Sequence, residues 1–239
     1  MKVGIIGSGV VAQALGDGFG KHRHEVMLGT RDPSKLVDWA ERNPTARIGD
    51  FAATAKFGEL VVLAVKGTVA AEALRAAGAE NLSGKPVIDA TNPIADAPPV
   101  NGVLRFFSTL DESLMQQLQR EFAESRFVKA FNSVGSAMMV NPQFAGGQPT
   151  MFICGNDDAA KKTVSEILDQ FGWETADMGR VEAARAIELA VYALVHSRLP
   201  AQPVDARVQT SALTCWRIRY GTGSTVPIGT SLVQDRMRL

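Results

Sequence analysis

Strand-like apolar runs alternate with stretches of helical periodicity along most of the chain. Strands are predicted at residues 3–6, 24–28, 47–48, 60–65, 86–90, 127–131, 151–155 and 174–176. Helices are predicted at residues 10–19, 33–42, 51–57, 68–77, 111–124, 157–171 and 181–188. Apolar strands that alternate with helices are typical of an α/β protein with a doubly wound, mostly parallel sheet.

The first strand runs directly into a Gly-x-Gly-x-x-Ala turn at residues 7–12. Gly7 permits the tight turn, Gly9 lets the backbone approach a pyrophosphate, and Ala12 lets the next helix lie close to the strand. The free N–H groups at the start of that helix, at Val10 and Val11, and the positive end of its dipole favour phosphate. The turn therefore predicts a Rossmann NAD(P)-binding fold.

The second strand ends in a segment that indicates which dinucleotide is bound. An NAD-selective site has Asp or Glu there, to accept hydrogen bonds from the ribose 2′-hydroxyl, whereas residues 29–35 read Gly-Thr-Arg-Asp-Pro-Ser-Lys. Arg31 can fork onto a 2′-phosphate, Thr30 can donate its hydroxyl, and Lys35 adds a point charge. We expect NADP(H). In the alternative interpretation Arg31 and Lys35 form a solvated surface around the Asp-Pro turn.

Composition and charge narrow the class of protein. The 239 residues carry 25 Lys and Arg against 25 Asp and Glu, so nucleic acid is not an expected partner. Neither a membrane span nor a signal peptide is expected, and the cytoplasm is the expected compartment. Two cysteines and three histidines without ligand spacing predict neither a disulfide framework nor a metal site.

Four segments together resemble a known family. They are Gly7-Ser8-Gly9, residues 29–33, Ala130-Phe131-Asn132 and the Ala-Ala-Arg-x-Ile-Glu helix at residues 183–188. These segments resemble the small NADP-dependent oxidoreductases that use the deazaflavin coenzyme F420, and the similarly built soluble domain of the six-transmembrane metalloreductases. The resemblance extends from residue 1 to about residue 188. It implies a homodimeric enzyme that transfers hydride between NADPH and a flavin-like or deazaflavin (F420) acceptor.

The resemblance also implies which residues form the site. On the 2′-phosphate side they are Ser8, Thr30, Arg31 and Lys35. On the nicotinamide side they are Ala64, Val65, Asn92 and Ala130. Lys66 ends a predicted strand at the carboxyl edge, where ligands bind in open α/β sheets, and residues 92–102 are a candidate wall of the substrate pocket.

The chain offers no Ser/His/Asp or Cys/His nucleophile arrangement, so we expect catalysis by positioning of two planar rings. Asn92, Asn132 and Ser133 are the candidate polar groups beside the reacting ring, and their alternative role is ordinary turn capping. Lys129 could reach the pocket, but a solvated strand end is the favoured interpretation. The alternative functions are a ferric or quinone reductase that uses free flavin and a non-catalytic NADPH-binding redox sensor.

Residues 189–239 differ in composition from residues 1–188. These 51 residues hold 6 Arg, 2 Asp, no Lys and no Glu, whereas all 9 lysines precede them. Codons can be chosen for residues 190–214 that, read one base later, encode LCMLWCIPGFLRNQWTHAFKLLP and a stop. That peptide resembles the C-terminus of the family. We therefore hypothesise an NADP-binding domain at residues 1–188 and an atypical tail at residues 189–239 that is a frameshift product. In the alternative interpretation the tail is a divergent C-terminal extension with its own fold.

Overall fold

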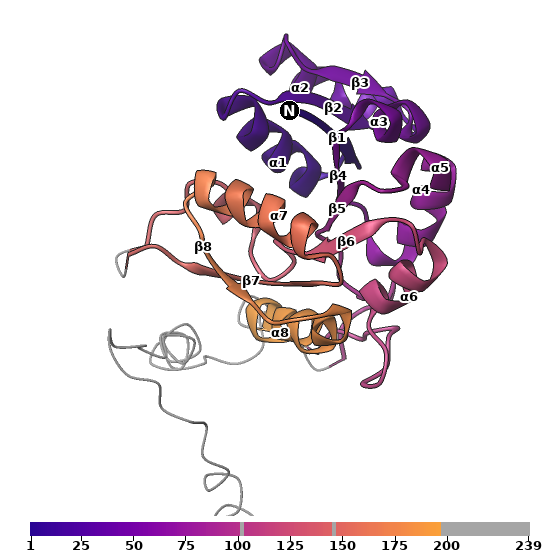
Figure 1. Ribbon diagram of the computed structural model, residues 1–239, viewed down its shortest axis with the longest axis vertical. Helices are drawn as coiled ribbons and strands as arrows, with labels where there is room; N and C mark the ends of the chain where they lie inside the picture. Colours follow the sequence, from indigo (N-terminus) through magenta and orange to yellow (C-terminus); the bar gives the residue numbers. More distant parts are fainter. Residues whose placement is uncertain (101–102, 145–146, 197–239) are drawn as a thin grey trace, which may run out of the picture. The chain divides into compact units, whose positions relative to one another are not determined.

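A single mostly parallel sheet forms the centre of the domain (Figure 1). The computed structural model describes residues 1–100, 103–144 and 147–196, and within them eight strands lie in the order β3-β2-β1-β4-β5-β6-β7-β8. The strands are β1 Lys2–Ile6, β2 Glu25–Gly29, β3 Arg47–Gly49, β4 Leu60–Leu63, β5 Pro86–Asp89, β6 Arg126–Lys129, β7 Thr150–Gly155 and β8 Glu174–Asp177. Only the β6–β7 pair in this part of the chain is antiparallel. The predicted doubly wound α/β fold is confirmed.

Helices cover both faces of the sheet (Figure 1). They are α1 Val10–Lys21, α2 Val37–Arg42, α3 Phe51–Phe57, α4 Ala70–Ala77, α5 Ala79–Leu82, α6 Leu114–Glu121, α7 Asp158–Gln170 and α8 Ala184–His196. Short 3-10 helices lie at η1 Pro33–Leu36, η2 Gly67–Val69, η3 Ser136–Met138 and η4 Val181–Ala183. Helices α1, α2 and α7 pack on one face, and α3 to α6 with α8 pack on the other.

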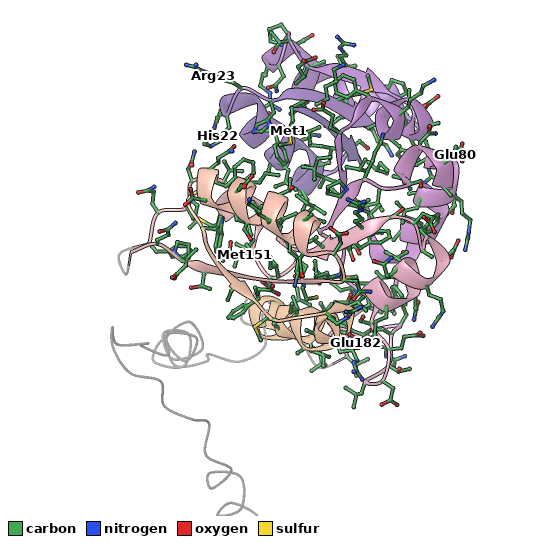
Figure 2. The ribbon with its side chains drawn as sticks, in the orientation of Figure 1. Met1, His22, Arg23, Glu80, Met151 and Glu182 are labelled. Carbon is green, nitrogen blue, oxygen red and sulfur yellow. The ribbon has the colours of Figure 1, made fainter. Side chains whose placement is uncertain are left out.

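The central strands are apolar because the middle of the sheet is buried on both faces. In β4, Val62 lies in the core cluster under α1 and α7, whereas Val61 and Leu63 lie in the cluster under α3 to α6. Met151 of β7 belongs to the first of these clusters (Figure 2). Burial on both faces explains why a central strand such as β4 reads as a continuous apolar run and not as an alternating one.

Local hydrogen bonds and backbone angles move some element ends from their predicted positions. The helix predicted from residue 111 begins at Leu114, because Ser113 forms a capping box with Gln116. The strand predicted over residues 127–131 ends at Lys129, and Phe131 adopts a left-handed φ of 64°. Helix α5 was not predicted, and Gly78, with φ of 83°, separates it from α4.

The order of the strands determines where a ligand can bind. The chain passes from β1 through α1 to β2, and later returns to place β4 on the other side of β1. In doubly wound sheets, ligands bind outside the carboxyl ends of the strands at such a reversal. Of the predicted tail at residues 189–239, the structure describes only residues 189–196, as the end of α8, and residues 197–239 lie outside it.

Candidate functional site

The glycine turn lies at the carboxyl end of β1, between β2 and β4. Gly7 has φ of 143°, and a Cβ there would lie 2.3 Å from the Ala64 carbonyl oxygen, so only glycine fits. Gly9 caps α1 with an ordinary φ of −78°, and no side chain bonds to the cap. A Cβ on Gly9 would meet no heavy atom within 4 Å. The space beside Gly9 at the N-terminus of α1 is therefore open, and the N-cap residue supplies no side-chain partner to the first N–H groups of the helix.

The tip of β2 is built around a hydrogen-bonded turn. The buried Thr30 hydroxyl accepts a hydrogen bond from the Asp32 amide at 3.1 Å. Hydrogen bonds from Ser34 hold the pKa of the Asp32 carboxyl below its ordinary value. Arg31 and Lys35 are exposed, and Arg31 Nη1 lies 3.0 Å from a carboxylate oxygen of Glu72 in α4. The turn thus holds Thr30 in place and presents two cations to solvent.

A hollow of about 760 Å³ adjoins this tip. Its walls come from the β2 exit, η1, α2 and the end of β3. The lining residues are Thr30, Arg31, Pro33, Val37, Ala40, Glu41, Ile48, Gly49 and Asp50. The charged lining residues are Arg31 and the carboxylates of Glu41 and Asp50. The apolar side chains suit a planar base, and Arg31 suits an anionic sugar phosphate attached to it.

The exits of β5 and β6 bring two predicted site residues into direct contact. Asn92 Nδ2 donates to the Asn132 carbonyl at 2.8 Å, and Asn132 Nδ2 donates to Asn92 Oδ1 at 3.1 Å and to the Ile187 carbonyl at 3.1 Å. Asn132 is 3% exposed, and its Oδ1 is buried without a hydrogen-bond partner among the described residues. Ser133 is half-buried beside this pair in the sequence.

Other predicted site residues lie at the exits of β4 and β6. Ala64 is buried, Val65 is half-buried, and Ala130 at the end of β6 is fully buried. Lys66 is exposed, and its Nζ lies 3.2 Å from Asp96. Hydrogen bonds from Lys66 and Thr68 hold the pKa of the Asp96 carboxyl below its ordinary value. Lys66 therefore lies at the rim of this edge, where a carboxylate already pairs with it.

Lys129 is buried, and its interpretation as a solvated strand end was wrong. Its side chain is 0% exposed, and Nζ donates to Asp89 at 2.9 Å, to Glu188 at 2.8 Å and to the Thr91 carbonyl at 2.9 Å. Burial alone would lower the pKa of Lys129, but the Asp89 and Glu188 carboxylates beside it raise the pKa above its ordinary value. The ammonium therefore stays charged within the core.

Backbone donors satisfy the remaining carboxylate oxygens of this cluster. Glu188 accepts the amides of Leu114 and Met115 at 2.9 and 3.0 Å, at the N-terminus of α6. Asp89 accepts the amide and hydroxyl of Thr91. The N-terminal amides and dipole of α6 offset the net negative charge of two carboxylates and one ammonium. The cluster ties β5, β6, α6 and α8 together.

Part of this charge cluster could have been predicted from the sequence. Asp89 and Lys129 each follow apolar residues inside a predicted strand, and in the structure they are register partners at the ends of two neighbouring parallel strands. Opposite charges at equivalent strand positions indicate a pair across the sheet. Glu188 carried no comparable local signal, because its partners lie 59 and more residues away.

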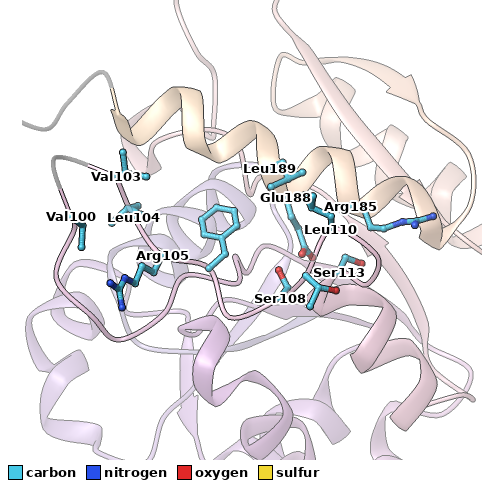
Figure 3. A pocket seen from close by; sticks show the side chains of 12 residues that line it. Val100, Val103, Leu104, Arg105, Ser108, Leu110, Ser113, Arg185, Glu188 and Leu189 are labelled. Atoms are coloured by element: carbon cyan, nitrogen blue, oxygen red, sulfur yellow. The ribbon is translucent and has the colours of Figure 1, made fainter.

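A second hollow, of about 620 Å³, lies between α8 and the segment that leads from β5 to α6 (Figure 3). Its lining residues are Val100, Val103, Leu104, Arg105, Phe106, Ser108, Thr109, Leu110, Ser113, Arg185, Glu188 and Leu189. Of the predicted pocket wall at residues 92–102, Val100 lines this hollow, and residues 101–102 lie outside the described residues.

Residues 2–93 match the family described as NADP oxidoreductase, coenzyme F420-dependent. The crystal structure of a candidate F420-dependent NADP reductase from Arthrobacter sp. FB24 is 35% identical, with a TM-score of 0.76, and the match covers 80% of this chain and 90% of that one. The chain belongs to the F420-dependent NADP oxidoreductase family. The expected resemblance and the expected class, an NADP-dependent oxidoreductase, are confirmed at the level of the family.

Two curated relatives are also similar to this chain. The F420-dependent NADP reductase of Methanocaldococcus jannaschii is 30% identical over 138 residues, which are 56% of this chain and 59% of the relative. Metalloreductase STEAP3 of Rattus norvegicus is 29% identical over 194 residues, which are 78% of this chain and 36% of STEAP3. The chain thus spans between about a third and three fifths of these relatives.

Among the described residues, no helix of this family member has the length and apolar character needed to cross a bilayer. Within the same ranges, no group of His, Cys, Asp and Glu side chains is arranged to hold a metal ion.

Proposed function

We propose that the protein binds NADP(H) across the carboxyl ends of β1, β2 and β4 and exchanges hydride with a deazaflavin or flavin-like acceptor. The observation that carries the proposal is Arg31 at the tip of β2, in the position where an NAD-selective site has a carboxylate. Membership of an NADP-dependent family supports the same cofactor.

The residues present fit a phosphorylated dinucleotide. The open space at Gly9 and the uncapped start of α1 suit a pyrophosphate, which the amides of Val10 and Val11 would bind. The 2′-phosphate would be held by Ser8, Thr30, Arg31 and Lys35. The hollow beside Thr30 would take the adenosine.

The nicotinamide side is mainly apolar, with one buried acceptor that has no hydrogen-bond partner among the described residues. Ala64, Val65 and Ala130 would line the ring and exclude water, and Asn132 Oδ1 lacks a partner that a carboxamide N–H could supply. The nicotinamide, when bound, supplies or accepts the hydride. The side chains would hold the two rings in position and exclude water from them, because hydride transfer needs two planar rings held close together. Asn92 and Asn132 keep each other oriented, and Ser133 is a further candidate donor.

The cofactor assignment is tested by Arg31→Ala, with Arg42→Ala as a control that removes an exposed guanidinium from the neighbouring α2. Losing charge-assisted hydrogen bonds to the phosphate should weaken NADPH binding about tenfold to a hundredfold. NADH binding should barely change, and the control should bind both cofactors as the unaltered chain does. Equal losses for NADPH and NADH would refute the 2′-phosphate assignment.

The acceptor is tested by stopped-flow measurement of NADPH oxidation with F420, FMN, FAD, ferric complexes and quinones. Oxidation by F420 or by a flavin alone supports the proposal. Turnover that requires free flavin together with a ferric salt or quinone favours the second candidate, which the likeness to Metalloreductase STEAP3 supports. Tight NADPH binding without oxidation by any acceptor would refute an enzyme and favour a redox sensor.

The reading frame after Glu188 affects the expected dimerisation and the expected turnover of the acceptor. If residues 189–239 are a frameshift product, NADPH binding through residues 1–93 should persist, whereas dimerisation and acceptor turnover should be impaired. Resequencing of the gene and the intact mass of the natural protein test the hypothesis. Sedimentation of chains with the given and the shifted frame tests the homodimer. An uninterrupted natural frame to Leu239 would refute the frameshift.

A further inference from the structure

An exposed ion pair joins the two segments that flank the exit of β1. Arg31 follows β2, and Glu72 lies in the first turn of α4, which follows β4. Because β1 lies between β2 and β4, the 3.0 Å contact connects the two sides of the glycine turn. The two side chains are 67% and 64% exposed.

Glu72 has Arg31 as its direct partner. The nearest cation on its own helix, Arg75, is held by Glu121 in a two-pronged pair at 2.6 and 2.9 Å. Among the described residues, Glu72 forms a salt bridge with Arg31 and with no other cation. The guanidinium expected to bind a 2′-phosphate thus already has an anionic partner from the protein.

We infer that Glu72 is a specificity-determining residue, whose carboxylate is exchanged for the 2′-phosphate at Arg31. The inference rests on the proposed function. Carboxylate and phosphate are both anionic acceptors for the same guanidinium nitrogen atoms. A 2′-phosphate must therefore displace Glu72 or bind beside a like charge, whereas a 2′-hydroxyl needs to do neither. Glu72 weakens NADPH binding selectively and narrows the preference for NADPH over NADH.

The expected effect is modest, because both groups are exposed. Exposed ion pairs are worth about 0.2–1 kcal/mol, so Glu72→Gln should tighten NADPH binding by a factor of about 1.4 to 5 and leave NADH unchanged. The gain should shrink at high ionic strength, since salt screens exposed charges. In the Arg31→Ala chain, the same substitution should lose most of its effect.

The experiment measures dissociation constants of NADPH and NADH by calorimetry for the full chain, Glu72→Gln, Arg31→Ala and the double variant. Glu80→Gln in α5 (Figure 2) removes an exposed carboxylate without that contact and is the matched control. Weaker or unchanged NADPH binding in Glu72→Gln, or equal tightening in the control, would overturn the inference. Equal loss of both cofactors in Arg31→Ala identifies a failure of the proposed function instead, and removes the basis for the exchange.

Discussion

Replacing Lys129 with methionine tests whether the buried charge cluster holds the domain together. Methionine keeps much of the length of the side chain but removes the ammonium, which lies 2.9 Å from Asp89 and 2.8 Å from Glu188. Two carboxylates would then face each other in the core without a cation. Removing one partner of a buried ion pair typically costs about 3–5 kcal/mol. This is a large share of a domain stability of about 5–15 kcal/mol.

The free energy of unfolding is measured by urea titration with circular dichroism. Lys85→Met is the matched control, because the Lys85 ammonium donates to the Ala55 carbonyl at 2.8 Å and pairs with no carboxylate in the described chain. The control should lose about 1 kcal/mol. Adding Glu188→Gln to Lys129→Met removes one of the opposed charges and should restore part of the loss.

The pH dependence gives the prediction a second readout. The raised pKa of Lys129 means that its stabilising contribution is complete below its ordinary value of 10.5 and is lost as the pH rises through the folded value. In Lys129→Met this loss of stability at high pH should be absent, because the titrating ammonium is gone, so the difference from the unaltered chain should shrink as the pH rises through that value. A loss no larger than that of Lys85→Met, or one that does not change with pH, would refute the reasoning.

Two further substitutions and one chemical probe test the geometry directly. Gly7→Ala should destabilise the fold in urea titrations, because its Cβ would lie 2.3 Å from the Ala64 carbonyl oxygen; unchanged stability would contradict the strained turn. Gly9→Ala should unfold normally but bind NADPH poorly, because its Cβ occupies only the open space expected for pyrophosphate; tight binding would argue against that site. Burial raises the pKa of Cys154 to about 12, so peptide mapping after iodoacetamide at pH 8 should find it unmodified until urea unfolds the chain, and rapid native labelling would contradict its burial.

Several features of the site follow from residues close together in the sequence. The strand, the glycine turn and α1 lie within the first 21 residues, and steric and hydrogen-bonding preferences over a few residues determine them. The position of Arg31 at a strand tip could be predicted from local sequence, because the second apolar run ends just before it. The alternation of apolar strands with helices likewise predicted the doubly wound sheet.

Other features depend on side chains that only the tertiary structure brings together. Arg31 and Glu72 are 41 residues apart, Asn92 and Asn132 are 40 apart, and Lys129 and Glu188 are 59 apart. Strand order and register decide these contacts, and neither can be read from local periodicity. Lys129 illustrates the difference, because an isolated lysine at a strand end belongs in water. Two carboxylates and the start of α6 make burial of its charge possible, and the fold alone assembles them.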